Sequence, residues 1–570
     1  MKKPVISFEN FTFKYRSQKE PTLHDINLTI HEGEIVLIAG PSGSGKSTIG
    51  HAINGLIPFS YKGDMTGSLK IHGKETRDLD IFSIGQMTGT VLQDTDGQFI
   101  GLSVGEDIAF SLENDQLEQA EMKDIVARTA KLVDVDTHLH HGLHELSGGQ
   151  KQRVSLAGVL VGDGDILLFD EPLANLDPAT GKQAIELISR ICKETGKTVV
   201  IIEHRIEDVL HGDVDRLVVV NEGKILADGS PADLLATDVL ERASIRKPLY
   251  LQACQYAGCD ITSEMHPDRL ESFNVQACSE ELQGWLATLP DEKPEKLSEM
   301  LLELKDVTFG YSSEKLTIKG IDLTVHKGEM TSIVGRNGAG KSTLTKLISG
   351  LEKPTTGRIF INGEDATEDT IAMRARKVGL VMQNPNHMIS KHMIYDEVAF
   401  GLVMRGVPEE EIRERVEETL RICGLYPFRN WPISALSFGQ KKRVTIASIL
   451  VLEPELIILD EPTAGQDFRH YTEMMDFLEQ LNKRGITILM VTHDMHLMLE
   501  YTKRAVVIGD GRILADAPAV DILADPNIVR EAHLAKTSLG TLAERAGIWN
   551  PQEFTRKFIA YDREVRAAWR

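Results

Sequence analysis

The sequence predicts an α/β protein with two similar domains in tandem, each built on a mainly parallel core sheet. Three observations lead to this fold class. Blocks of the 570-residue chain return after about 290 residues, which indicates an internal repeat. Short runs rich in valine and isoleucine alternate with stretches of helical periodicity. In each half, a glycine-rich loop follows such a run and precedes a helical stretch.

The repeat also sets the expected domain boundaries. The offset between copies is 295 residues at the glycine-rich loop and 290 from Gly67 onward, so the first copy has five extra residues within IPFSYKGDMTG at 57–67. We expect a first domain at 1–262, an acidic connector at 263–299 and a second domain at 300–570.

Each core element has a residue pattern of its own. Strands are expected at 34–40, 198–204 and 216–222, because these runs are apolar on both faces, as in a buried parallel sheet. Helices are expected at 46–56 and 178–194, where apolar residues recur at helical spacing.

Two helices are expected outside the sheets. One lies within the polar, acidic connector, at about 279–289. The other lies in the C-terminal tail at 540–570, where mixed charges at helical spacing indicate a solvated or partner-facing surface.

Composition limits the classes of function. A net charge of −22 weighs against nucleic acid as a partner, because phosphate binding relies on clustered lysine and arginine. No stretch approaches the ~20 apolar residues that cross a bilayer, and the start MKKPVISFEN has no apolar run typical of a secretory signal. A cytosolic protein is therefore expected.

The cysteines predict no metal site. None of the five forms a CxxC pair, and the spacing of the three at 254–278 fits no zinc template. We expect them to be reduced and structural. They are Cys192, Cys254, Cys259, Cys278 and Cys423.

Both glycine-rich loops satisfy the pattern G-x-x-x-x-G-K-[ST] in a strand-to-helix context, which predicts nucleotide phosphate binding. Backbone N–H groups and a helix N-terminus would hold the phosphates. Lys46 and Lys341 would reach the β- and γ-phosphates, and Ser47 and Ser342 would hold Mg²⁺. The loop residues are Gly40, Pro41, Ser42, Gly43, Ser44, Gly45, Lys46, Ser47 and Thr48 in the first copy and Gly335, Arg336, Asn337, Gly338, Ala339, Gly340, Lys341, Ser342 and Thr343 in the second.

Two carboxylates follow the apolar run of ILLFDE and of LIILDE. Asp170 and Asp460 are expected to serve Mg²⁺. Glu171 and Glu461 are expected to activate or position the attacking water.

In these motifs, both halves resemble the nucleotide-binding domain of ABC transporters. LSGGQ at 146–150 and LSFGQ at 436–440 resemble the signature sequence of that family. The resemblance implies ATP and Mg²⁺ as ligands and a P-loop NTPase fold. In that fold each domain has a mainly parallel core sheet, an antiparallel β subdomain and a helical signature subdomain.

The resemblance also assigns roles that single residues would not reveal. Gln93 and Gln383 match the Q-loop glutamine that contacts Mg²⁺ and the water, and His204 and His493 match the switch histidine at the γ-phosphate. Tyr15 and Tyr311 match the aromatic residue that stacks on adenine, and Asp177 and Asp467 match the D-loop aspartate.

In this family two domains pack head to tail, so each ATP lies between the phosphate loop of one domain and the signature of the other. The resemblance thus implies pairing of the two domains within the chain. The signature contacts would come from Ser437, Gly439 and Gln440 for the first ATP and from Ser147, Gly149 and Gln150 for the second.

The second signature has Phe438 where the first has glycine. A phenylalanine can occupy this position if the backbone is helical and the ring points away from the site. We therefore expect two competent sites that need not be equal.

The segments after the two glutamines, at 93–113 and 383–403, resemble ATPases of energy-coupling factor importers, which take up vitamins and metal ions. This resemblance implies a peripheral protein at the cytoplasmic face of the membrane, bound to a transmembrane coupling protein and a separate substrate-binding membrane component. The alternatives are the ATPase of another ABC importer or exporter and a soluble ABC-F translation factor. The linker of such a factor is long, charged and helical and suits contact with ribosomal RNA, whereas the connector here is acidic and interrupted by prolines. The resemblance does not identify the transported solute, because in these systems no residue of the nucleotide-binding domains touches it.

Overall fold

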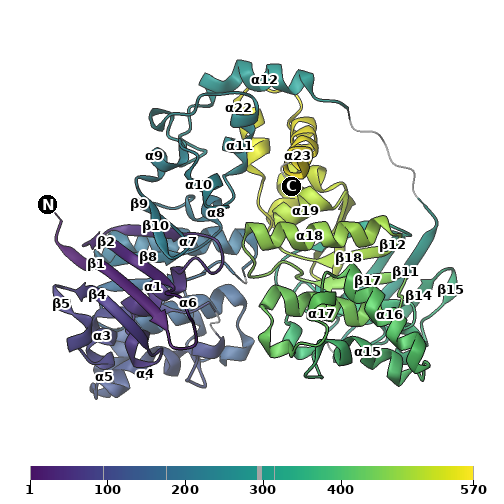
Figure 1. The fold of residues 1–570 in the computed structure, drawn as a ribbon, viewed down its shortest axis with the longest axis horizontal. Coiled ribbons are helices and arrows are strands. Elements are labelled where there is room, and N and C mark those ends of the chain that lie inside the picture. Colours follow the sequence, from purple (N-terminus) through teal and green to yellow (C-terminus); the bar gives the residue numbers. More distant parts are fainter. Residues whose placement is uncertain (1, 94–95, 175, 292–297, 313–314, 569–570) are drawn as a thin grey trace. The chain divides into compact units, whose positions relative to one another are not determined.

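The computed structural model describes residues 2–93, 96–174, 176–291, 298–312 and 315–568 (Figure 1). Parts of the expected connector (292–297) and of the segment after Gln93 (94–95) lie outside the described residues. The chain divides into two compact units. The first comprises Met1–Thr288, Asp467–Arg469 and Leu542–Ile548, and the second comprises the rest.

The first unit contains an antiparallel sheet in the order β2-β1-β4-β5. Its strands are β1 (Pro4–Tyr15), β2 (Leu23–His31), β4 (Gly63–Ile71) and β5 (Lys74–Glu75). In β1 and β2, buried apolar residues recur at every second position over much of their length, as in a strand with one face on a core.

The core sheet of the first unit has six strands in the order β10-β9-β3-β8-β7-β6, parallel except for the pair β9–β10. Its strands are β3 (Ile35–Ala39), β6 (Thr88–Val91), β7 (Ile166–Asp170), β8 (Thr198–Ile202), β9 (Arg216–Asn221) and β10 (Lys224–Gly229). Strands β3 and β8 are buried at every position, which explains their unbroken apolar runs.

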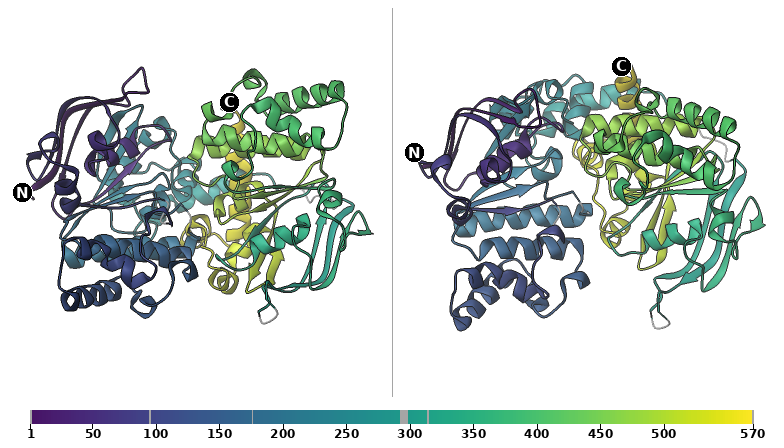
Figure 2. Two further views of the ribbon diagram at one scale, coloured as in Figure 1. Left: turned by 90° about the horizontal axis from the view of Figure 1, so that it is seen from below. Right: turned by 60° about the horizontal axis from the view of Figure 1, so that its bottom comes forward.

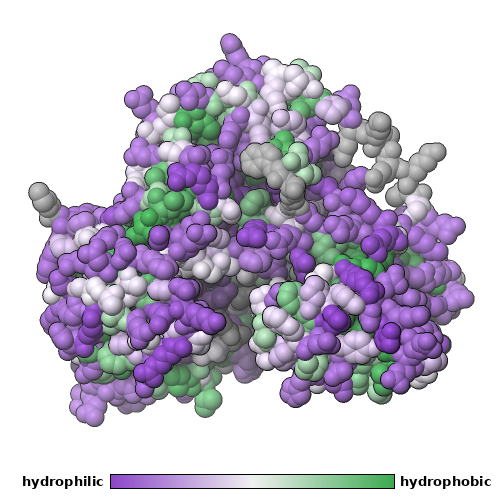
Figure 3. Space-filling view, viewed as in Figure 1, coloured by the Kyte–Doolittle hydropathy of each residue, from purple (hydrophilic) through white to green (hydrophobic). Residues whose placement is uncertain are grey.

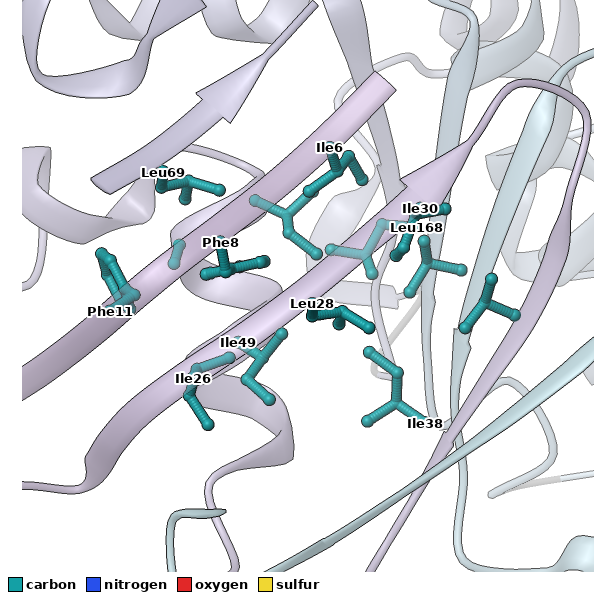
Figure 4. Packing of buried hydrophobic residues seen from close by; sticks show 14 of the residues in the cluster. Ile6, Phe8, Phe11, Ile26, Leu28, Ile30, Ile38, Ile49, Leu69 and Leu168 are labelled. Carbon is teal, nitrogen blue, oxygen red and sulfur yellow. The ribbon is translucent and has the colours of Figure 1, made fainter. Parts of the chain in front are cut away.

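One hydrophobic core joins the two sheets of this unit. Figure 4 shows Phe8 and Leu28 of the antiparallel sheet beside Ile38 and Leu168 of the core sheet, with Ile49 of the helix after the phosphate loop among them. This packing fixes the phosphate loop, because its strand and its helix both belong to the core.

Helices cover the core sheet and form a separate helical part, as two further views show (Figure 2). Those of the first unit are α1 (Lys46–Ile53), α2 (Leu56–Phe59), α3 (Ile81–Met87), α4 (Val104–Asn114), α5 (Gln119–Leu132), α6 (Gly148–Leu160), α7 (Pro178–Thr195), α8 (Ile206–Val209), α9 (Pro231–Leu235), α10 (Val239–Arg242), α11 (Leu249–Tyr256) and α12 (Ser279–Thr288).

The second unit repeats this plan. Its antiparallel sheet has the order β12-β11-β14-β15, and its core sheet has the order β16-β17-β18-β13-β19-β20 with only β19–β20 antiparallel. The strands are β11 (Met300–Phe309), β12 (Ile318–His326), β13 (Met330–Val334), β14 (Thr356–Ile361), β15 (Glu364–Asp365), β16 (Val378–Val381), β17 (Leu456–Asp460), β18 (Thr487–Val491), β19 (Arg504–Gly509) and β20 (Arg512–Ala517).

The helices of the second unit follow the same order along the chain. They are α13 (Lys341–Ser349), α14 (Ile371–Arg374), α15 (Ile394–Met404), α16 (Glu409–Ile422), α17 (Phe438–Leu450), α18 (Phe468–Lys483), α19 (Met495–Tyr501), α20 (Ala519–Ala524), α21 (Pro526–Glu531), α22 (Ser538–Arg545) and α23 (Pro551–Ala568). Of these, the first two residues of α18 and residues 542–545 of α22 belong to the first unit. Among the described residues, no helix combines the length and the apolar character that crossing a membrane requires.

The expected α/β fold class is confirmed, and the expected strands and helices of the first domain correspond to β3, β8, β9, α1 and α7. The connector helix is confirmed as α12. The tail prediction was wrong in one respect: Phe554 and Phe558 of α23 are fully buried, so this helix packs one face into its unit. Its charges misled because several of them are covered in the fold: Asp562 is buried, and Arg566 pairs with it and with the buried Glu500.

Candidate functional site

The glycine-rich loop of the first unit turns from β3 into α1. Lys46, the first residue of α1, is only 6% exposed, and its Nζ donates to the carbonyl oxygens of Gly40 (2.7 Å) and Pro41 (2.8 Å). Gly45 has a φ of 104°, and a Cβ at Gly40 would lie 2.2 Å from the carbonyl oxygen of Val220. Both glycines are therefore required for the loop to close around the lysine.

The second unit has the same arrangement. The Nζ of Lys341 donates to the carbonyl oxygens of Gly335 (2.6 Å) and Arg336 (3.0 Å), and Gly340 has a φ of 106°. In each unit the loop delivers backbone N–H groups, a lysine and a helix N-terminus to one place. This combination binds phosphate groups.

Glu171 follows β7 and meets the other expected catalytic groups of its unit. It has a φ of 48°, and its N–H donates to the carbonyl of Ile202 at 2.9 Å. Gln93 donates to its Oε2 at 2.7 Å, and Nδ1 of His204 lies 3.8 Å from its Oε1. Burial would raise the pKa of Glu171, but the hydrogen bond and charge of His204, together with Lys46, lower it. The carboxylate is thus kept ionised beside the phosphate loop.

Glu461 of the second unit has the same backbone, with a φ of 46° and a 2.9 Å bond from its N–H to Val491. Nδ1 of His493 lies 2.7 Å from its Oε1, closer than in the first unit. Gln383 is exposed, and among the described residues no hydrogen bond joins it to Glu461. The second unit therefore brings the histidine and the glutamate together and leaves the glutamine apart.

Asp170 and Asp460, at the ends of β7 and β17, fit a cation-binding role. Burial, followed by the charge of the adjacent glutamate, raises the pKa of each to about 6. The Oδ1 atom of Asp170 is buried and has no hydrogen-bond partner among the described residues. The hydroxyl-bearing Ser47 and Ser342 are exposed at the first turns of α1 and α13. Oxygen ligands of this kind suit Mg²⁺.

The two sites differ at the residue before the histidine, which the sequence analysis missed. In the first unit it is Glu203, a fully buried carboxylate whose Oε1 accepts hydrogen bonds from the N–H groups of His204 (2.8 Å) and Arg205 (3.2 Å). In the second it is Thr492, whose hydroxyl donates to Glu461 at 3.4 Å. Burial would lower the pKa of His204, but the charges of Glu203 and Glu171 raise it.

Replacement of Glu203 by threonine is expected to change the pH dependence of stability in the first unit. A histidine with a raised folded-state pKa stabilises the fold below its unfolded pKa, and this contribution is lost as the pH rises through the folded-state pKa. As the pH rises from about 6 to about 9, the melting temperature of the wild type should therefore fall more than that of Glu203→Thr. The control is Glu186→Thr, which removes an exposed carboxylate from His211 and should leave the pH profile unchanged. Parallel profiles for wild type and Glu203→Thr would contradict the expectation.

A second difference lies beneath the glutamates. In the first unit, Gln152 donates to the carbonyl of Pro172 at 2.7 Å. In the second, the corresponding residue is Lys442, fully buried, which donates to the carbonyl of Glu461. Burial lowers the pKa of Lys442 to about 8, against the attraction of Glu461 and Asp460. The sites are similar in plan and unequal in charge.

The signature sequences open helices α6 and α17. Ser147 and Ser437 are the N-cap residues, and in each a capping box joins the serine to the glutamine three residues later. The Oγ atoms accept from the N–H groups of Gln150 (3.4 Å) and Gln440 (3.3 Å). Each signature thus presents a serine hydroxyl at a helix N-terminus.

Phe438 is the first residue of α17 and is 44% exposed, so the mismatch between the signatures is accommodated as expected. The glycine after it has a different environment in each unit. A Cβ at Gly149 would lie 2.4 Å from Thr180, whereas at Gly439 the nearest atom, in Gln466, is 3.9 Å away. A hollow of about 430 Å³ adjoins the second signature and is lined by Ser437, Gly439 and Gln440 among others.

The expected adenine-stacking tyrosines lie beside the phosphate-loop helices. The hydroxyl of Tyr15 is 3.1 Å from Thr48, and that of Tyr311 is 3.4 Å from Thr343. Tyr311 is 58% exposed, whereas Tyr15 is half-buried because Tyr61, from the segment that carries the five extra residues, packs 6.0 Å from its ring.

Each unit contains a phosphate loop after one strand of the core sheet and paired carboxylates at the end of another, which defines a protein of the P-loop nucleotide-binding class. Comparison with known proteins specifies the class further. A family described as ABC transporter matches residues 23–174 and 318–464, and one described as ATP-binding cassette cobalt transporter matches 237–309.

Two curated relatives match almost the whole chain. A putative ABC transporter ATP-binding protein of Enterococcus faecalis is 58% identical over 99% of this chain and 100% of its own length. One of Clostridium perfringens is 54% identical over 99% and 100%. The solved structure of cbiO1 from Clostridium perfringens, described as part of the ABC transporter complex cbiONQ, is 36% identical, covers 43% of this chain and 100% of its own, and has a TM-score of 0.39.

The chain belongs to the ABC transporter family, as an ATP-binding protein with two cassettes. The predicted family and fold are confirmed. Members of this family hydrolyse ATP, so the expected enzyme class is confirmed as well.

Proposed function

We propose that this protein is the energy-coupling ATPase of a membrane importer of the energy-coupling factor type, which takes up a vitamin or a metal ion. The observation that carries the proposal is that each unit contains both a phosphate loop with its carboxylates and a capped signature helix. This doubling supports two composite ATP sites, with the phosphate loop of one cassette facing the signature of the other.

Within each site the residues would divide the work. Lys46 and Lys341 would bind the ATP phosphates, while Glu171 and Glu461 would hold the attacking water and accept its proton. The bound cation would neutralise phosphate charge, held by Ser47, Gln93 and Asp170 in the first site and by Ser342, Gln383 and Asp460 in the second. The signature serines would bind the γ-phosphate from the other side.

The force on a membrane partner would come from closure of the cassettes. ATP can drive closure only as far as it binds the closed form better than the open one. The signature contacts would exist only in the closed form, so they would supply this difference. Hydrolysis and phosphate release would then remove it and reopen the cassettes.

The importer type rests on the segments after the two glutamines. Helices α4 and α15 carry an exposed phenylalanine at equivalent positions, Phe110 (37% exposed) and Phe400 (36% exposed). Leu102 and Met404 nearby are 86% and 73% exposed. Hydrophobic groups also lie at the edge of each unit where Figure 1 labels these helices (Figure 3). Exposed apolar side chains gathered in this way mark protein interfaces. The cobalt-transporter family that matches 237–309 supports the same importer type.

The experiment is purification of the tagged chain from its native membranes in mild detergent, followed by identification of bound proteins. We expect a transmembrane coupling protein and a small substrate-binding membrane protein at the cytoplasmic face of the membrane. Ribosomal proteins in their place would overturn the proposal in favour of a translation factor. Co-purification of conventional transporter subunits, without a small substrate-binding membrane protein, would overturn the energy-coupling factor type and leave the role as a transporter ATPase standing.

The combined variant Leu102→Asp and Met404→Asp is expected to lose these partners. Burying a large apolar side chain contributes about 1.5–3 kcal/mol, so recovery of the complex should fall at least about tenfold. ATPase activity of the isolated chain should persist, because both residues are exposed and outside the phosphate sites. The control is Phe82→Asp with Ile371→Asp, at side chains 63% and 55% exposed on other helices. Equal recovery of the two double variants would contradict the assignment of the surface.

A further inference from the structure

Three cysteines that are separated in sequence come together in the first unit. The Sγ atoms of Cys254, Cys259 and Cys278 all lie within 4.8 Å of one another. Cys254 and Cys278 are buried, and Cys259 is half-buried. This cluster cannot be predicted from the spacing of the cysteines in the sequence, because the distances between the sulfurs depend on how the chain after α11 folds back.

The local fold explains how the three thiols meet. Cys254 lies in the last turn of α11, and Gly258 after it has a φ of 84°. This turn lets the N–H of Cys259 donate to the carbonyl of Cys254 at 3.0 Å, so the chain doubles back over the helix end. Cys278 arrives from the other direction, as the residue directly before α12. The backbone thus fixes all three positions.

In the stretch of chain that carries Cys278, several apolar side chains are buried. Phe273, Val275 and Leu282, from the same stretch of chain as Cys278, are 0%, 1% and 0% exposed. A disulfide would join two of the sulfurs and leave the third thiol beside it without a partner. A metal ion would use all three at once.

We propose that Cys254, Cys259 and Cys278 bind one zinc ion. Three sulfur ligands favour a thiophilic ion such as Zn²⁺ over Mg²⁺ or Ca²⁺. Sulfurs at about 2.3 Å from a tetrahedral zinc ion are about 3.8 Å apart, and the sulfurs of the cluster, all within 4.8 Å of one another, are already close to this separation. Among the described residues the group itself contains no histidine or carboxylate, so water or the carboxylate of Glu281, whose charge acts on Cys259, would take the fourth position.

The ion would fasten the start of the connector to the first cassette. It would tie the end of α11 to the start of α12, across a stretch that contains little regular secondary structure. A cross-link of this kind stabilises by restricting the unfolded chain, and it does so without any contribution to the phosphate sites. The inference is therefore independent of the proposed function.

The test begins with the full-length chain purified without chelators and analysed for metals by mass spectrometry. We expect about one zinc ion per chain in the wild type and essentially none in the double variant Cys254→Ser with Cys278→Ser. The matched control is Cys192→Ser with Cys423→Ser, which removes two other buried thiols and should keep the zinc. ATPase activity of each variant reports that it has folded.

Two further measurements distinguish a bound zinc ion from copper(I) and from a disulfide. Cobalt(II) added to the metal-free wild type should give the charge-transfer bands of thiolate ligation, absent from the Cys254→Ser/Cys278→Ser variant. A strong chelator should lower the melting temperature of the wild type and leave that of this variant unchanged. The proposal is overturned if wild type and variant contain the same zinc, if copper(I) binds in its place, or if a thiol titration reveals a disulfide in the cluster.

Discussion

Glu171→Gln and Glu461→Gln are each expected to lower steady-state ATP hydrolysis strongly and to leave ATP bound in the altered site. Glutamine has the shape of glutamate but cannot accept a proton, and loss of a general base costs about 10²–10⁴-fold in the step it serves. The hydrogen bond from Gln93 and the ion pair with His493 show that each carboxylate is held in place by its own unit. The chemistry should therefore fail without loss of the fold.

The measurement is the turnover number of each single variant together with the amount of labelled ATP that stays bound after rapid gel filtration. The control is Glu453→Gln, a glutamate with a φ of 57° in an exposed turn of the second unit. It shares the left-handed backbone of Glu461 and should turn over ATP at the wild-type rate. A wild-type rate for Glu171→Gln or Glu461→Gln would mean that the site it lines is not catalytic.

Much of this site could be predicted from the sequence because local patterns position it. A strand of β-branched residues followed by glycines, lysine and serine places Lys46 at a helix N-terminus in any α/β protein with a parallel sheet. The serine of each signature precedes a helix with glutamine three residues later, which is a capping box in sequence as well as in structure. Such features depend on neighbours within a few residues.

The features that sequence analysis missed depend on residues brought together by the fold. Glu203 differs visibly from Thr492, but its effect on His204 follows from complete burial, which no local pattern reveals. The cysteine cluster needs a turn at Gly258 and the return of the chain at Cys278. The tail helix α23 looked solvated because charged residues outnumber the few apolar ones that it buries. In all three cases, the feature depends on tertiary packing, which no local sequence pattern reveals.

Arginine at both signature serines, in the double variant Ser147→Arg with Ser437→Arg, is expected to abolish most ATP hydrolysis. Each serine occupies an N-cap, where a long cationic side chain would fill the space in front of the helix N-terminus and remove the hydroxyl. Loss of one preorganised donor to a reacting oxyanion costs about 10²–10³-fold, and both composite sites would lose theirs. ATP should still bind, because the phosphate loops with Lys46 and Lys341 are unchanged.

A control for this variant distinguishes loss of the signature contact with ATP from loss of the helix N-cap. Loss of an N-cap costs about 1 kcal/mol, too little to unfold a cassette. Ser230 also caps a helix, accepting from the N–H of Asp233 at 3.2 Å, and lies outside both signatures. Ser230→Arg should therefore lose about as much stability as either of the two signature substitutions alone and keep its ATPase rate. Nucleotide affinity is measured with a fluorescent ATP analogue, and turnover by phosphate release. Full-speed hydrolysis by Ser147→Arg/Ser437→Arg would show that each phosphate loop works without a signature, and the composite site would have to be abandoned.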